Sequence, residues 1–147
     1  MLAPSPLRAL IVADDPAERG TLRHRIETHG ITVCGTAPDR TAALSLAIRE
    51  RPDLCVIHDA PPLDAIATAA AVCGRAPDVR VVLIGAQPDD QTLLAAVATG
   101  ACGYLPFETP GPRLVAALHD VAAGLPAFPR RLGGLLIAEL RGDARPR

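Results

Sequence analysis

The order of apolar runs along the chain is the feature that most constrains its fold. Runs of strand length alternate with longer segments of helical period, and the strands are expected at residues 7–12, 31–35, 54–57, 79–84 and 102–105. Alternation at this spacing predicts parallel strands joined by right-handed crossovers, with helices on both faces of the sheet. In such folds the ligand crevice lies at the carboxyl ends of the strands, which directs attention to the residues that follow each run.

Local signals place the helices between these strands. Asp15, Asp39 and Asp89 each precede a helical segment and can accept hydrogen bonds from its first backbone N–H groups. Gly100 and Gly124 follow the fourth and fifth helical segments, where glycine commonly ends a helix. The sequence therefore predicts five helices, the last of them over residues 110–123.

The residues after Gly124 differ in character from the rest of the chain. Pro126 and Pro129 interrupt the helical pattern, so we expect one domain over residues 1–125 and a linker or tail over 126–147. Leucines spaced for one helix face could form a short helix in this tail, although two glycines within it would each cost about 1 kcal/mol relative to alanine. These residues are Leu132, Leu135, Leu136 and Leu140, with Gly133 and Gly134 between them.

Composition excludes several classes of function. The 147 residues are 49% hydrophobic, which is enough for one domain with a buried core, and the net charge of −1 offers no broad basic field for nucleic acid. No apolar run is long enough to span a membrane, and the first residues lack the pattern of a signal peptide, so we expect a cytoplasmic protein without membrane contact. All 15 basic residues are arginine, so no step that needs a lysine ammonium is available.

Three motifs in order resemble the receiver domain of bacterial response regulators, in particular the subfamily with a C-terminal helix-turn-helix. They read LIVADDP after the first strand, RPDLCVIHDAPP around the third and GACGYLPFETP around the fifth, and the likeness runs from about Leu7 to Gly124. The resemblance implies a flavodoxin-like α/β fold, a doubly wound five-stranded parallel sheet in the order 2-1-3-4-5 with five helices.

The same resemblance locates a phosphorylation pocket and shows that its chemical groups are replaced. The family has an acidic pair after the first strand, a phosphoacceptor aspartate ending the third, a hydroxyl ending the fourth, an aromatic residue in the fifth and a lysine shortly after it. In this order, those positions hold Ala13 and Asp14, His58, Gly85, Tyr104 and Phe107. The resemblance thus implies an atypical, degenerate receiver whose switch aromatic, Tyr104, is retained.

These replacements argue against phosphoryl transfer. In the family, magnesium and the lysine neutralise the charge that develops as the aspartate attacks a phosphoryl group. Here Asp14 is only a weak candidate for a metal ligand, Asp15 follows it but points elsewhere in the pattern, and the imidazole of His58 is a poor ligand for magnesium. We therefore expect no catalytic residue, no cofactor and no enzymatic activity.

The sequence favours a phosphorylation-independent regulatory and dimerisation module of a transcriptional response regulator. We expect a homodimer, formed through helix 4, strand 5 and helix 5 or through helices 1 and 5, with DNA bound only through an output domain absent from this chain. We also expect His58 to fill the old acceptor site and to hydrogen-bond or ion-pair with Asp14, because the two strand tips converge.

Two alternatives remain open from the sequence. Asp59 neighbours the acceptor position and could act as a true phosphoacceptor with magnesium if the strand ended early or bulged. A pocket with Gly85 and Phe107 in place of a hydroxyl and a lysine would be roomier and less charged, which suits a small-molecule effector.

Overall fold

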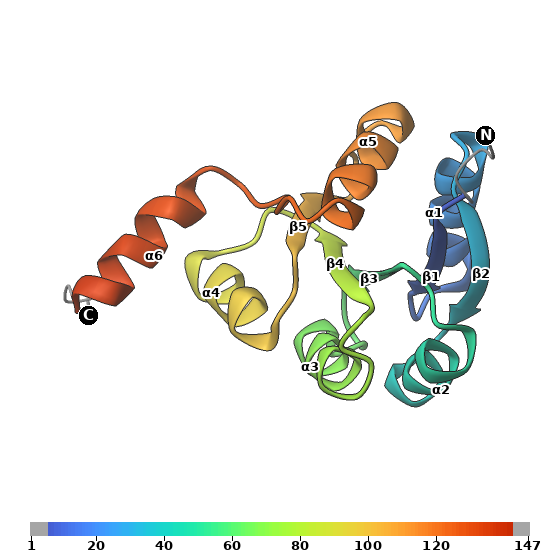
Figure 1. The fold of residues 1–147 in the computed structure, drawn as a ribbon, viewed down its shortest axis with the longest axis horizontal. Helices are drawn as coiled ribbons and strands as arrows, with labels where there is room; N and C mark the ends of the chain where they lie inside the picture. The colour runs from blue at the N-terminus through green and yellow to red at the C-terminus, as the bar shows by residue number, and fades with distance from the viewer. Residues whose placement is uncertain (1–5, 143–147) are drawn as a thin grey trace.

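Five parallel strands form the centre of the structure. In the computed structural model, which describes residues 6–142, the sheet has the order β2-β1-β3-β4-β5 (Figure 1). The strands are β1 (Arg8–Val12), β2 (Thr32–Ala37), β3 (Leu54–Asp59), β4 (Arg80–Gly85) and β5 (Gly103–Pro106). All four strand pairs are parallel, so the predicted doubly wound α/β fold and its strand order are confirmed.

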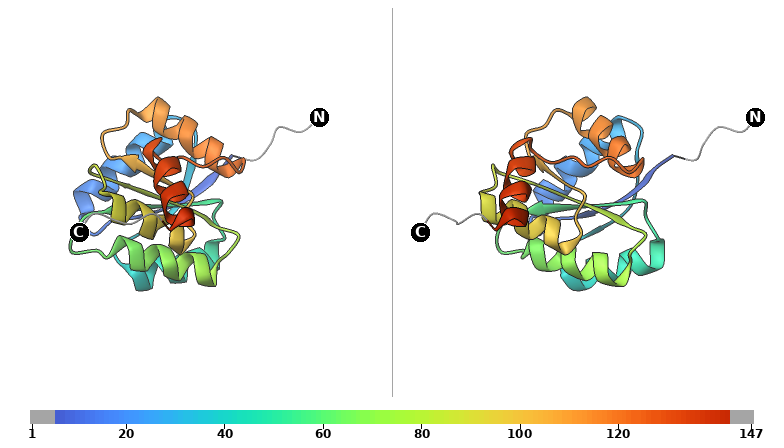
Figure 2. Two further views of the ribbon diagram at one scale, coloured as in Figure 1. Left: turned by 90° about the vertical axis from the view of Figure 1, so that its left-hand side faces the viewer. Right: turned by 60° about the vertical axis from the view of Figure 1, so that its left-hand side comes forward.

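Within residues 6–142, six helices accompany the sheet: the five predicted and the short helix that the sequence left open for the tail. They are α1 (Pro16–Thr28), α2 (Arg40–Glu50), α3 (Ala65–Arg75), α4 (Asp90–Thr99), α5 (Gly111–Ala122) and α6 (Arg131–Arg141). Figure 1 shows α1 and α5 on one face of the sheet and α2, α3 and α4 on the other, while Figure 2 shows α6 against α4. No helix in the described part of the chain is long and apolar enough to cross a membrane.

Aspartate side chains fix where four of the helices begin. Asp15, Asp39, Asp64 and Asp89 accept hydrogen bonds from backbone N–H groups of the first turn of α1, α2, α3 and α4, at 2.8, 2.9, 3.0 and 2.7 Å. Such caps satisfy donors that would otherwise lack a partner inside the helix. Each capped helix therefore starts shortly after a strand, which holds the loops at the carboxyl edge of the sheet in place.

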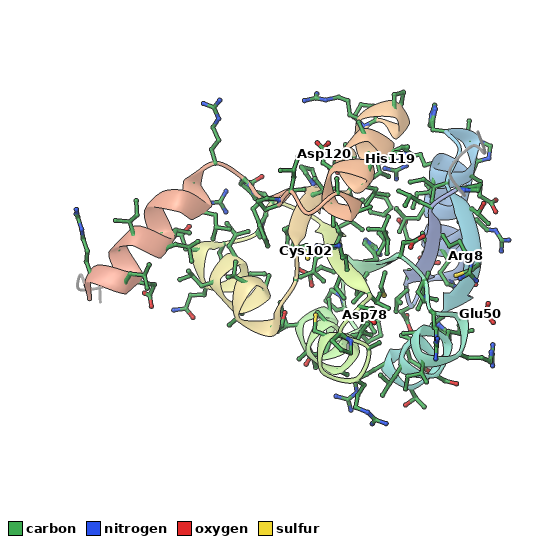
Figure 3. The ribbon with its side chains drawn as sticks, in the orientation of Figure 1. Arg8, Glu50, Asp78, Cys102, His119 and Asp120 are labelled. Carbon is green, nitrogen blue, oxygen red and sulfur yellow. The ribbon has the colours of Figure 1, made fainter. Side chains whose placement is uncertain are left out.

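At the amino-terminal ends of the strands, an arginine of β1 binds the C-terminal end of α2. Arg8 donates a hydrogen bond to the last carbonyl of α2, that of Glu50, at 2.6 Å, and forms an ion pair with the Glu50 carboxylate at 3.2 Å. Figure 3 shows the two side chains beside each other between β1 and α2. A cation at a helix C-terminus is favourable because it meets the negative end of the helix dipole.

The strand period divides the core into two apolar layers. Along β3, Leu54 and Val56 pack with α1 and α5, whereas Cys55 and Ile57 pack with α2, α3 and α4. Successive side chains of a strand point to opposite faces, so this alternation continues into the last two residues of β3. Those two residues are His58 and Asp59, so their side chains point to opposite faces of the sheet.

The C-terminal segment, residues 125–141, is not a loose tail, and we call it the strap. Its Ala127 donates a backbone hydrogen bond to Cys102 at 3.0 Å and accepts one from the N–H of Tyr104 at 2.9 Å, which extends the sheet beyond β5. Gly103 lies between them, where a Cβ atom would stand 2.8 Å from the carbonyl oxygen of Ala127. The absence of a side chain at position 103 is therefore what lets the two backbones meet.

Helix α6, the second half of the strap, depends on its contact with α4. Leu132 is 6% exposed and belongs to the same apolar layer as Leu93 of α4, and Arg131 forms an ion pair with Asp90 at 3.3 Å. No side chain caps the start of α6, and its two internal glycines cost about 1 kcal/mol each. The last residues of the predicted tail, 143–147, lie outside the described part of the chain.

Two glycine-to-alanine substitutions in this region should have opposite effects. Gly103→Ala should lower the free energy of unfolding by about 1–3 kcal/mol, because the new Cβ would collide with Ala127. Gly133→Ala should raise it by up to about 1 kcal/mol, because nothing lies within 4 Å of that position and alanine favours a helix. Urea unfolding followed by circular dichroism measures both; equal effects would contradict the described pairing of the strap with β5.

Candidate functional site

The end of β3 sends its two polar residues to opposite faces of the sheet. His58 continues the side of Leu54 and Val56, which faces α1 and α5, and Asp59 continues the side of Cys55 and Ile57. The register pairs Asp59 with Gly85 at the end of β4, without a bulge at this point. The two residues therefore meet different neighbours and have different chemical surroundings.

His58 packs against Phe107 in the loop after β5. Their ring centroids are 4.6 Å apart and the planes are tilted by 40°, a favourable arrangement for aromatic rings. The guanidinium carbon of Arg25 in α1 lies 4.8 Å from the centroid of the Phe107 ring, and the same group donates hydrogen bonds to the carbonyls of Phe107 and Thr109 at 2.5 and 3.0 Å. Arg25 thus fixes the loop that carries Phe107 over His58.

Asp59 is bound by Tyr104 on the other side. The tyrosine hydroxyl donates a hydrogen bond to a carboxylate oxygen of Asp59 at 2.5 Å, and Tyr104 is only 3% exposed. Burial, and then the hydrogen bond to Asp59 and its negative charge, raise the pKa of Tyr104 well above its ordinary value. Both groups are therefore satisfied by each other, with the tyrosine in an inward position.

Gly85 makes room for this position of the tyrosine. A Cβ atom on residue 85 would lie 2.8 Å from the Tyr104 hydroxyl oxygen and 2.9 Å from the carbonyl oxygen of Asp59. The hydroxyl of Tyr104 thus occupies the space into which a side chain at the end of β4 would project. The loss of the hydroxyl residue and the inward tyrosine are two parts of one packing arrangement.

A cleft of about 490 Å³ lies at the carboxyl edge of the sheet, over the ends of β1, β3 and β4. It is bordered by five carboxylates and no arginine among the residues that line it: Asp14, Asp15, Glu18, His58, Asp59, Ala60, Pro61, Ala86, Phe107 and Glu108. The cleft is more acidic than the sequence suggested, because Glu18 and Glu108 also reach it. Like charges around such a cleft disfavour the approach of a phosphate group.

The acidic residues after β1 have separate roles. Asp14 is exposed and borders the cleft, whereas the carboxylate of Asp15 caps α1 through the Ala17 N–H. Ala13 is fully buried, and the guanidinium of Arg19 donates hydrogen bonds to the carbonyls of Ala13 and Asp14 at 2.8 and 3.0 Å. Within residues 6–142, no group of three or more histidine, cysteine or acidic side chains is arranged to hold a metal ion.

One predicted contact is wrong. His58 and Asp14 border the same cleft, yet no hydrogen bond or ion pair joins these two described residues. The imidazole instead faces Phe107, because the ring of Phe107 occupies the space beside it. The sequence also missed Arg25, and no local signal could have identified it, since it lies 82 positions from Phe107 along the chain.

Comparison with known proteins settles the family. Residues 9–119 match the family model of the response regulator receiver domain. The chain belongs to the response regulator receiver family. This receiver domain is 31% identical over 145 residues to the probable transcriptional regulatory protein NarL of Mycobacterium tuberculosis, covering 97% of the chain and 67% of that protein. It is 30% identical over 115 residues to DevR/DosR of the same species, a DNA-binding transcriptional activator, covering 78% of the chain and 53% of that protein.

Solved structures agree with this placement. The receiver domain is similar to the signal receiver domain of a NarL response regulator from Mycobacterium tuberculosis, with a TM-score of 0.76, 29% identity and coverage of 82% of this chain and 99% of that one. A LuxR-family response regulator from Aurantimonas gives a TM-score of 0.80 at 26% identity, covering 95% of this chain and all of that one. The domain is thus a receiver of the kind found in NarL/LuxR-type regulators, and it spans only about half to two thirds of the two mycobacterial relatives.

The bond between Tyr104 and Asp59 can be tested by titrating the tyrosine, which is the only one in the chain. Because the pKa of Tyr104 is raised in the folded state, the unfolded chain loses its phenolic proton first, and stability should fall as the pH rises above about 10. Asp59→Asn keeps the shape but removes the charge, so it should lower the pKa of Tyr104. The absorbance of the phenolate measures this pKa in each variant.

Asp14→Asn serves as the control, because Asp14 borders the same cleft without contacting the tyrosine. It should leave the titration of Tyr104 unchanged. Identical titration curves for the wild type and Asp59→Asn would contradict the hydrogen bond.

Proposed function

We propose that this receiver domain is an atypical one, which serves as a regulatory and dimerisation module of a transcriptional response regulator without being phosphorylated. The observation that supports this most directly is the packing of His58, at the acceptor position, against Phe107, at the position of the family's lysine. An aromatic pair stands where the family has a carboxylate nucleophile and an ammonium group. Phe107 cannot neutralise the transferred group as the family's lysine does, and His58 offers an imidazole nitrogen in place of the carboxylate that is phosphorylated in the family.

The remaining groups do not replace what is lost. Phosphoryl transfer depends on positive charge around the transferred group, and the cleft supplies carboxylates instead. The residues present do not suit magnesium, since Asp15 is engaged as a helix cap and the acceptor position offers an imidazole. We therefore assign no cofactor and no catalytic residue to this domain.

The alternative that uses Asp59 as a phosphoacceptor is not favoured. Its carboxylate accepts the hydrogen bond of a buried tyrosine, and the neighbouring end of β4 is Gly85, which has no hydroxyl to offer a phosphoryl oxygen. Attack by Asp59 would first require the break of its bond to Tyr104. That break would leave the tyrosine hydroxyl, which is only slightly exposed, without its partner.

The proposed setting of the module follows from its relatives. We assign residues 1–125 to the receiver module and 126–147 to the linker towards an output domain, through which alone DNA would be bound. DevR/DosR is described as DNA-binding, and the matching part of the chain spans 53% of it. We further propose a homodimer in the cytoplasm, where a transcription regulator meets its DNA.

Treatment with acetyl phosphate and magnesium tests phosphorylation directly. The wild-type chain should gain no phosphate mass and should show no spectral change with beryllofluoride. The variant His58→Asp/Phe107→Lys, which restores an acceptor and an ammonium, is the positive control and should gain a slowly formed adduct. A phosphate on wild-type Asp59, absent in Asp59→Asn, would overturn the proposal; intact-mass and peptide spectra decide between these outcomes.

A second function, the sensing of a small molecule, is supported by the cleft itself. Its volume of about 490 Å³ suits a small organic ligand, and the tilted rings of His58 and Phe107 border it on one side. The surrounding carboxylates favour a cation over an anion. On this proposal the domain would respond to an amine or guanidine in place of a phosphoryl group.

Thermal unfolding in the presence of a panel of primary amines and guanidines tests this second function. A ligand of the cleft should raise the melting temperature of the wild type, because binding to the folded state alone stabilises it. Matched carboxylates and phosphates should have no effect, and Phe107→Ala should reduce the response to the amines. Equal small shifts for all compounds, or a response that survives Phe107→Ala, would argue against binding in the cleft.

A further inference from the structure

The strap is held by a surface that could receive it from any copy of the chain. We call this surface the seat; it consists of the free edge of β5 at residues 102–104 and the adjacent side of α4 with its preceding loop. Ala127 pairs with the backbone of the edge, Leu132 enters the apolar layer of α4, and Arg131 contacts the Asp90 carboxylate and the Pro88 carbonyl. The seat thus joins the edge of β5 to an apolar face of α4, and Figure 2 shows α6 lying against α4.

The seat is shaped for the strap in particular. Gly103 allows a backbone to approach so closely that a Cβ at that position would stand 3.0 Å from the Cβ of Ala127. An uncovered strand edge is otherwise a template for pairing with other chains, so an edge adapted to one segment selects that segment. Figure 3 labels Cys102, which marks the β5 end of the sheet where the strap pairs.

The strap is also the element most easily released. It joins α5 through exposed residues 123–126, which include Gly124 at φ +96° and Pro126. Of the residues of α6, only Leu132 is buried, and the helix has two glycines and no capping side chain. Segments with few buried contacts open at a lower free energy than the sheet they cover.

The closed chain leaves part of α6 without a cover. Leu140 is 88% exposed and Ile137 is 54% exposed, both in the C-terminal half of α6. Ile137 is thus about half covered when the strap occupies its own seat, and Leu140 is almost uncovered.

We propose that two copies of this chain exchange their straps, so that each strap occupies the partner's seat. The exchange keeps the contacts of Ala127, Leu132 and Arg131 and changes only the connection at residues 123–126, so it needs no new interface. The proposal rests on the homodimer proposed above and names the surface that forms it. Protein concentration then decides between closed monomers and the exchanged dimer.

Two variants test the exchange in the full chain: one disrupts the seat and the other disrupts the strap. Gly103→Val blocks the seat but leaves the strap sound, and Leu132→Asp spoils the strap but leaves the seat sound. Wild-type protein should dimerise with rising concentration in sedimentation velocity, and each variant alone should be a monomer. An equal mixture of the two should form a heterodimer, because one strap still meets one seat; native mass spectrometry with one variant isotope-labelled identifies it.

The outcomes separate the exchange from the homodimer. If both variants dimerise like the wild type, the dimer uses another surface, so the homodimer stands and the exchange is overturned. If the wild type stays a monomer at millimolar concentration, the proposed homodimer and the proposed exchange are both overturned. A mixture that forms no heterodimer while the wild type dimerises and each variant alone is a monomer also overturns the exchange.

A charge-reversal pair covers the case in which one of these variants does not fold. Arg131→Asp and Asp90→Arg each place like charges in their own closed chain, whereas an exchanged heterodimer pairs opposite charges at both seats. The mixture should therefore associate more strongly than either variant alone. Equal association of the mixture and of the single variants would contradict the exchange.

Discussion

The alternation of side chains at the end of β3 determines what the carboxyl edge of this sheet can do. His58 and Asp59 are adjacent in sequence, yet the strand period turns them to opposite faces, one towards Phe107 and the other towards Tyr104. On the function proposed above, the carboxylate one residue beyond the acceptor position does not replace the acceptor, because the register of β3 with β4 is regular here. On that proposal, an aspartate beside the acceptor position does not by itself make a working site.

Tyr104 connects the cleft to the strap. Its hydroxyl contacts Asp59 at the cleft, and its backbone N–H contacts Ala127 of the strap. Two glycines stand beside these contacts, Gly85 where the hydroxyl needs space and Gly103 where the strap backbone needs space. Tyr104 is thus held at its hydroxyl and at its backbone N–H, and in both places a glycine leaves the room that the contact needs. A movement of Tyr104 would therefore disturb the cleft, the strap or both.

The sequence predicted the parts of this structure that depend on short-range patterns. Strands and helix starts at aspartates follow from periodicity and capping, the sheet order follows from the resemblance to the receiver family, and the structure agrees with all three. The contact between His58 and Asp14 was predicted wrongly, because the register shows that two strand tips converge but not which way an imidazole turns. The docking of the strap on α4 was missed for a related reason: leucine spacing predicts a helix, whereas its partner is chosen by the geometry of Gly103 and Asp90, far away in the sequence.

The carboxylates of the acidic cleft differ in their hydrogen-bond partners. Asp59 is satisfied by Tyr104 and Asp15 by the first turn of α1, while Arg19 covers the neighbouring carbonyls of Ala13 and Asp14. Two of the five carboxylates that border the cleft thus accept hydrogen bonds from groups of the domain itself. On the function proposed above, the domain would change state from the β5 side, where the strap pairs with the edge of β5, rather than through phosphate or magnesium.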